Sequence, residues 1–193
     1  SGTGKSHRAA RVAKELDAQA IIDDGLLIEN DQIIAGSSAK LEPTIIDAIK
    51  AAIFTDEGRA REMMVALENL APGRILILGT SVKMVDRITS RLNLPPAAKV
   101  VHIEDFASEK EIRKAKYLRT HFYKHVIPAP TLEVKKTFPG TLVDSLDIFL
   151  KKKETTGKKE WVEQSIIRPT FTLHGKLVIT DHAITNIVDY ASQ

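Results

Sequence analysis

The chain opens with two glycines that alternate with polar residues directly before an amphipathic stretch. The run is Ser1-Gly2-Thr3-Gly4-Lys5-Ser6, and Ala9, Val12, Ala13 and Leu16 follow at the spacing of one helical face. Glycine lets backbone N–H groups turn inward around an anion, where a Cβ would clash. The positive end of the helix macrodipole would face the same point. The pattern favours an anion-binding loop at a helix start over an ordinary turn.

These residues match the second half of the phosphate-binding pattern G-x-x-x-x-G-K-[ST]. In that pattern Gly2, Thr3 and Gly4 supply backbone N–H groups, Lys5 reaches the β- and γ-phosphates, and the Ser6 hydroxyl ligates Mg²⁺. His7 comes directly after the loop, where it would either approach the nucleotide or lie on the helix surface. The pattern also needs a strand and a further glycine before Ser1. We therefore expect the natural chain to extend upstream.

Composition excludes several classes of protein. The 193 residues are 43% hydrophobic and 27% charged, which is typical of a globular protein with one domain and an appendage. A net charge of +3, dispersed along the chain, predicts no nucleic-acid partner. No apolar run approaches the ~20 residues of a membrane span. The absence of cysteine excludes disulfides and thiolate sites and suits a reducing compartment, so we expect a cytoplasmic protein.

Apolar runs and amphipathic stretches alternate along residues 1–150. Extended runs are expected at residues 20–22, 26–28, 33–34, 75–78 and 100–103. Further helices are expected at residues 43–53, 60–70, 82–92, 108–122 and 141–150, the first with Ile45, Ile46 and Ile49 on its apolar stripe. This alternation predicts an α/β/α domain of three layers with a mostly parallel sheet. Residues 75–78 and 100–103 should be interior strands of that sheet, because both runs are apolar throughout.

The end of the chain has a different character. Residues 151–164 begin with a lysine-rich, polar stretch and predict a linker after the first domain. Residues 165–193 contain short apolar runs and a helical face formed by Ile184, Ile187, Val188 and Ala191. About thirty residues cannot bury a core alone, so we expect the beginning of a second, α+β domain. Its apolar face predicts a protein partner or self-association.

Asp23 and Asp24 directly follow the first predicted strand. Open α/β sheets bind ligands at the carboxyl ends of their strands. One of these carboxylates could hold Mg²⁺ or act as the base toward a hydroxyl acceptor. The run Asp23-Asp24-Gly25 is equally good turn chemistry, and both interpretations stay open. Because adjacent residues in a strand point to opposite faces, we expect only one of the two to serve.

Residues 1–150 resemble the P-loop nucleoside-triphosphate-binding superfamily, and within it small-molecule kinases such as adenylate and shikimate kinase. The resemblance rests on Gly4-Lys5-Ser6, on Asp23-Asp24, and on basic residues in the late helix. It implies binding of ATP or another nucleoside triphosphate with Mg²⁺ held by Ser6 and Asp23 or Asp24. It also implies a lid that carries arginines, for which Arg113 and Arg119 are the candidates.

One departure from the family concerns the run at residues 75–78. A hydrolase of this superfamily ends that strand with Asp or Glu, whereas Gly79-Thr80-Ser81 follows here. Either Asp23 or Asp24 supplies the carboxylate, or the site binds nucleotide without effective chemistry. The resemblance therefore leaves open whether the protein is an enzyme, a kinase or a weak NTPase.

The last ~25 residues resemble the opening of an alkaline-shock-protein domain, a small α/β module linked to bacterial envelope stress. The residues that carry this resemblance are Arg168-Pro169-Thr170-Phe171, then Gly175 to Thr180, and a helix with Ile184 and Ile187. Two functions follow from the two resemblances. One is transfer of the γ-phosphoryl group to a small-molecule acceptor. The other is a non-catalytic regulatory module in which nucleotide changes how the C-terminal segment meets a partner.

Overall fold

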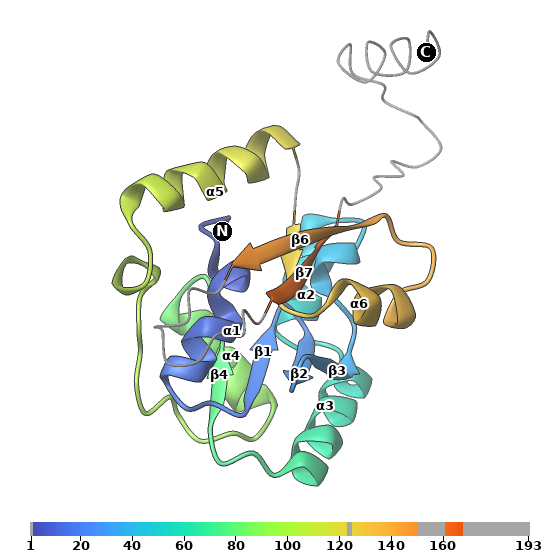
Figure 1. Cartoon of the computed structure of the whole chain (residues 1–193). Coiled ribbons are helices and arrows are strands. Elements are labelled where there is room, and N and C mark those ends of the chain that lie inside the picture. Colours follow the sequence, from blue (N-terminus) through green and yellow to red (C-terminus); the bar gives the residue numbers. More distant parts are fainter. Residues whose placement is uncertain (1, 123–124, 150–160, 168–193) are drawn as a thin grey trace, which may run out of the picture.

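A four-stranded mixed sheet forms the centre of the computed structural model, which describes residues 2–122, 125–149 and 161–167 (Figure 1). Its strands are β1 (Ala20–Asp23), β2 (Leu26–Glu29), β3 (Gln32–Gly36) and β4 (Ile75–Ile77). They lie in the order β3-β2-β1-β4. β1 pairs in parallel with β4 and antiparallel with β2, and β2 pairs antiparallel with β3. The α/β class is confirmed, but this sheet is mostly antiparallel.

Two tight turns account for the antiparallel pairing. Asp24 and Gly25 join β1 to β2, and Asn30 and Asp31 join β2 to β3. All four residues have positive φ, from 44° at Asp24 to 88° at Gly25. Two-residue connections of this conformation match the twist of hairpin strands. The turn interpretation of Asp23-Asp24-Gly25 is therefore confirmed, and it brings β2 back beside β1.

Helices cover both faces of this sheet. These are α1 (Lys5–Glu15) and α6 (Thr131–Thr137) on one face and α3 (Glu57–Leu70) and α4 (Val82–Arg91) on the other. The described residues also form α2 (Ile45–Ala52) and α5 (Glu109–Phe122), with 3-10 turns η1 (Ala39–Leu41) and η2 (Ile103–Asp105). Ile21 packs on one face with residues of α1 and α6. Ile22 packs on the other face with residues of α3 and α4. Successive residues of a strand point to opposite faces, so β1 is buried on both sides.

Helix α2 forms where the sequence predicts a helix, but its isoleucine stripe faces solvent. Ile45 is 79% exposed, and Ile46 and Ile49 are also exposed. The buried positions are Ala51 and Ala52 at the end of the helix. Apolar spacing thus identifies the helix without identifying the face that packs on the core.

Neither of the two predicted interior strands lies in the interior of a sheet within the described residues. β4 ends the strand order, and its three residues are only half-buried. Residues 100–102 form no strand, Val100 is exposed, and Ile103 begins η2. The prediction for residues 100–103 is wrong because a short apolar run does not by itself distinguish a strand from a loop. Within the described residues no strand pairs with the outer edge of β4.

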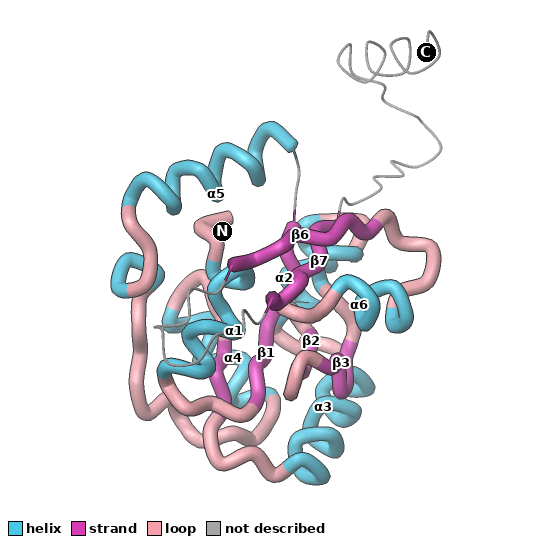
Figure 2. The backbone as a smooth tube through the Cα atoms, in the orientation of Figure 1, coloured by secondary structure: helices cyan, strands magenta, loops and turns pink. Residues whose placement is uncertain are grey.

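A second, antiparallel sheet contains β5 (His125–Ile127), β6 (Val143–Phe149) and β7 (Trp161–Ile167), in the order β5-β7-β6. Figure 2 shows β6 and β7 lying side by side, in register from Val143 opposite Ile167 to Phe149 opposite Trp161. The helix predicted at residues 141–150 is wrong. The apolar spacing there fits a helix, but pairing with β7 holds the segment as a strand.

Of the residues after 149, the structure describes only those of β7, so the domain boundaries predicted there can be compared with the structure only at this strand. The predicted limit between linker and second domain, residues 164 and 165, falls within this strand. Residues 150–160 and 168–193, which hold the lysine-rich stretch and the predicted helix with Ile184, lie outside the described residues. No helix in the described part of the chain has the length and apolar character needed to cross a membrane.

Candidate functional site

The glycine loop (residues 2–6) curves around the start of α1. Gly2 has φ 81° and Gly4 has φ 89°, while Thr3 and Lys5 have negative φ. Backbone that alternates between left- and right-handed conformations directs successive N–H groups into one concave surface, which suits an anion. Gly4 precedes the first helical residue, and no side chain caps the helix there. The loop and the helix start therefore present uncapped backbone donors at the same point.

Lys40 lies where the predicted metal ligands converge. Its ammonium nitrogen Nζ donates to Ser6 Oγ at 3.0 Å and to Asp23 Oδ2 at 2.7 Å, and lies 3.1 Å from Asp24 Oδ2. The side chains of Lys40 and Asp23 are 9% and 4% exposed, whereas that of Asp24 is 34% exposed. The structure thus brings Ser6 and both carboxylates together around a lysine, whereas we expected only one of Asp23 and Asp24 at the site.

A magnesium ion does not fit the same point while Lys40 occupies it. Magnesium needs oxygen ligands at 2.0–2.1 Å, whereas these oxygens stand at 2.7–3.1 Å from a nitrogen that carries a positive charge. The described residues also hold no group of three or more His, Cys, Asp or Glu side chains placed for a metal ion.

Burial and charge act in opposite directions on these groups. Burial opposes the charge on Lys40, but Asp23 and Asp24 outweigh it and raise the pKa of Lys40. Burial raises the pKa of Asp23, against the attraction of Lys40, and the charge of Asp24 adds to the rise. Burial also acts on Asp24, but Lys40, with Lys5 and His125, lowers the pKa of that carboxyl overall. When two carboxylates share one ammonium, their pKa values move apart: here that of Asp23 rises and that of Asp24 falls.

Arg119 contacts the glycine loop, as one of the two lid candidates was expected to do. A Cβ on Gly2 would lie 2.8 Å from Arg119 Cγ, so the arginine stem packs directly on the loop. One guanidinium nitrogen, Nη1, is buried and has no hydrogen-bond partner among the residues that the structure describes. Burial lowers the pKa of Arg119, and Asp24 opposes that shift. A buried donor without an acceptor is costly, which indicates that an acceptor belongs there.

Arg113, the other lid candidate, is not brought to the loop. Its side chain is 72% exposed and forms an ion pair with Glu109, one turn earlier on α5. Six residues of α-helix turn through about 600°, so Arg113 and Arg119 face different directions. α5 itself runs past the N-terminal end of the chain, with Arg119 near its end (Figure 1).

Two histidines lie close to these charges. Burial and then Arg8 of α1 lower the pKa of His7, and Glu111 of α5 opposes that shift. The charges that act on His7 are therefore not those of Asp23 and Asp24. Burial, then Arg119 and Lys40, lower the pKa of His125 to about 4. Neither Lys40 nor His125 belongs to a motif, and the sequence contains no signal for either of them.

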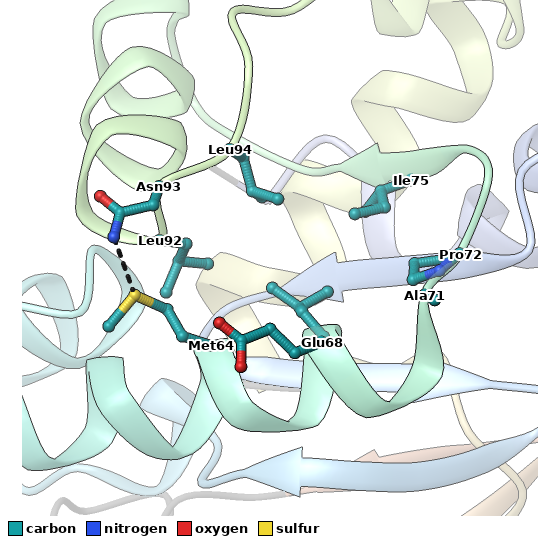
Figure 3. A pocket seen from close by; sticks show the side chains of 9 residues that line it. Met64, Glu68, Ala71, Pro72, Ile75, Leu92, Asn93 and Leu94 are labelled. Atoms are coloured by element: carbon teal, nitrogen blue, oxygen red, sulfur yellow. Dashed lines mark hydrogen bonds between the residues drawn. The ribbon is translucent and has the colours of Figure 1, made fainter.

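A separate hollow of about 240 Å³ lies between α3, α4 and the start of β4 (Figure 3). Met64, Leu92, Leu94 and Ile75 give it mostly apolar walls, and the Asn93 amide points to Met64 Sδ at 3.5 Å. None of the candidate site residues lines it. It adds nothing to the chemistry of the glycine loop.

Comparison with known proteins gives no relative from which a function could be taken. No family model, no curated protein and no solved structure matches the chain. The functional argument therefore depends on the geometry of the glycine loop and the charges around it.

Proposed function

We propose that the chain binds the phosphates of ATP or another nucleoside triphosphate at the glycine loop and the start of α1. The observation that carries this proposal is the concave backbone from Gly2 to Lys5, uncapped and packed beneath a buried arginine donor without an acceptor. Lys5 supports it, because within the described part of the chain its ammonium makes a single long hydrogen bond, 3.4 Å to Thr3 Oγ1. A phosphate would accept from all of these donors.

Part of the fold also supports the proposal, namely the parallel strands and the helices beside them. The parallel pair β1–β4, with helices on both faces, suits a variant of the P-loop arrangement. The hairpins β1–β2–β3 are additions to such an arrangement. A hydrolase of the superfamily would have a carboxylate at the end of β4. Here Ser81 follows that strand, and its hydroxyl caps α4 by accepting from Met84 N.

The geometry favours a nucleotide-dependent binding module over an efficient enzyme. Asp23 is buried and held by Lys40, so it has little freedom to act as a base. One observation keeps phosphoryl transfer as a second candidate. Asp24 is one-third exposed and has a lowered pKa, so it is ionised at neutral pH and could orient a hydroxyl acceptor.

The test is direct titration of the chain with ATP by calorimetry, first with the parent and then with Lys5→Ala. Loss of one charge-assisted hydrogen bond should weaken the affinity by roughly tenfold to a hundredfold. Lys14→Ala is the matched control, since Lys14 is an exposed lysine in the last turn of the same helix. It should leave the affinity unchanged.

Two outcomes would contradict the proposal. One is a parent chain that binds neither ATP nor pyrophosphate. The other is equal affinity in the parent and Lys5→Ala, because phosphate would then bind elsewhere. Release of ADP in the presence of candidate hydroxyl acceptors, lost in Asp24→Asn, would favour phosphoryl transfer over the binding module.

A further inference from the structure

Backbone hydrogen bonds, as well as ion pairs, hold Lys40 in place. It lies in η1, where its own N–H donates to the buried hydroxyl Ser38 Oγ at 3.2 Å. The preceding residue, Ala39, donates its N–H to the carbonyl of Asp24 at 2.7 Å. These contacts tie η1 to the turn that carries the carboxylates. The backbone of Lys40 is therefore held beside these carboxylates, and its ammonium does not extend from a flexible surface segment.

The surroundings of the ammonium are complete. A lysine ammonium has three N–H donors and no acceptor. Among the described residues, the oxygens that pair with Nζ belong to Ser6, Asp23 and Asp24. One is a hydroxyl and two are carboxylates, which is the ligand chemistry that a divalent cation would otherwise take beside a bound phosphate.

The charges around the loop already attract an anion without a metal. Lys5, Lys40 and Arg119 contribute three positive charges, and Asp23 and Asp24 contribute at most two negative charges. His125 is neutral near pH 7, because its pKa is about 4. The site is therefore net positive whichever protonation state Asp23 takes. In most phosphate sites of this kind, the divalent cation supplies that excess.

We propose that Lys40 takes the place of the divalent cation, so that the site binds nucleoside triphosphate without a metal. The ammonium is the internal counter-charge, and the Ser6 hydroxyl is its ligand instead of a ligand of magnesium. This inference rests on the proposed function, because it concerns how the same site holds phosphate. It concerns binding only and involves no bond that forms or breaks.

The first experiment needs no variant. ATP affinity of the full chain is measured by calorimetry in excess EDTA and again in millimolar Mg²⁺. We expect the dissociation constant to change by less than about threefold between the two buffers. A parent chain that binds ATP only with Mg²⁺ would overturn the inference and leave the proposed function standing. A chain that binds ATP in neither buffer would contradict the proposed function itself.

The second experiment removes the ammonium. Lys40→Ala leaves the buried carboxylate of Asp23, the partly exposed carboxylate of Asp24 and the Ser6 hydroxyl without the ammonium between them. This variant should therefore acquire a requirement for Mg²⁺ in ATP binding. Its melting temperature should also rise when Mg²⁺ alone is added, whereas that of the parent should not change. This thermal readout remains informative if the variant is too unstable to titrate with ATP.

The matched control is Lys50→Ala, which removes an exposed lysine whose nearest carboxylate is Asp47 on the same helix. It should bind ATP equally in both buffers, as the parent does. The inference is wrong if Lys40→Ala behaves like this control and neither its ATP affinity nor its melting temperature responds to Mg²⁺.

Discussion

Asp23 and Lys40 form the most deeply buried ion pair among the described residues. Removing Lys40 leaves the buried carboxylate of Asp23 without its counter-charge, whereas removing Asp23 leaves Lys40 with the pair to the more exposed Asp24. Isolated charges are expensive away from water, so breaking such a pair typically costs about 3–5 kcal/mol. The pair therefore constrains the fold around the glycine loop whether or not a ligand is bound. Variants at these two positions need a stability measurement beside every binding measurement.

His125 gives the site a dependence of stability on pH. Its pKa is about 4 in the folded chain, below the ordinary 6.5, because of burial and then of Arg119 and Lys40. Below pH 6.5 the unfolded chain binds a proton that the folded chain does not, so folding stability falls as pH decreases from about 6.5 to about 4. After a discount for partial exposure, the loss is roughly 2 kcal/mol.

Urea denaturation of the parent and of His125→Gln, at steps between neutral pH and pH near 4.5, checks this expectation. His7 and the carboxyl groups titrate in both chains, so the difference between the two curves isolates His125. The free energy of unfolding of the parent should fall more steeply with decreasing pH than that of the variant, because the variant has no imidazole to protonate at this position. Parallel curves would show that His125 titrates alike in the folded and unfolded chains.

Site residues that belong to local sequence patterns could be predicted, whereas those brought in from distant parts of the chain could not. Gly4, Lys5 and Ser6 belong to one local motif, and Asp23 and Asp24 end a strand, so sequence spacing was sufficient to nominate them. Lys40 and His125 reach the same point only through η1 and the second sheet. No local pattern encodes that meeting. Arg119 was nominated with Arg113, and only the structure distinguishes the two.

At the scale of elements, α5 is attached beside the loop by one arginine of α1. Arg8 Nη2 lies 2.6 Å from Glu111 Oε1, and Arg8 Nε donates to the carbonyl of Phe106 at 3.1 Å. Glu111 also accepts from the N–H and the hydroxyl of Ser108, and its own N–H donates to Ser108 Oγ, so the two residues form a capping box at the helix start. One glutamate thus both begins α5 and connects it to α1.

Arg8→Met should loosen α5 without unfolding the core. Hydrogen exchange of residues 108–118 should become roughly threefold to tenfold faster, the range expected when a partly buried polar contact is lost. Arg113→Met is the control, since it removes only the exposed pair with Glu109. Exchange measured by mass spectrometry that is equally fast in both variants would mean that α5 is held by other contacts.

The strands show where local reading succeeds and where it fails. The first strand and the turn after it were predicted from Ile21-Ile22 and Asp24-Gly25, because a short apolar run that ends in turn residues is a local signal. β6 was predicted as a helix because Leu142, Leu146 and Phe149 fit a helical spacing. Its strand conformation depends on β7, which lies beyond residue 160 in the sequence. Pairing over that separation leaves no trace within the segment itself.

For the whole molecule, the question is whether the chain divides after residue 150. The second sheet shares its packing with the first, since Ile127 is buried in the same cluster as Ile21, and Val143 packs against that cluster. α6 contacts both β6 and β7. The central strand of the second sheet, β7, thus spans the predicted limit between the linker and the second domain. Whether residues 168–193 form a separate module stays a prediction.

Two shortened chains decide the position of the boundary. A chain that ends after Lys159 lacks β7, so β5 and β6 lose the strand that both pair with. Ile127 and Val143 then lose support for their packing, and the free energy of unfolding should fall by about 3 kcal/mol or more. A chain that ends after Ile167 keeps β7 and should stay within about 1 kcal/mol of the parent. If both shortened chains instead unfold like the parent in urea, residues 161–167 contribute nothing to the first domain. The boundary predicted from the lysine-rich stretch would then hold, and β7 would belong to the C-terminal module.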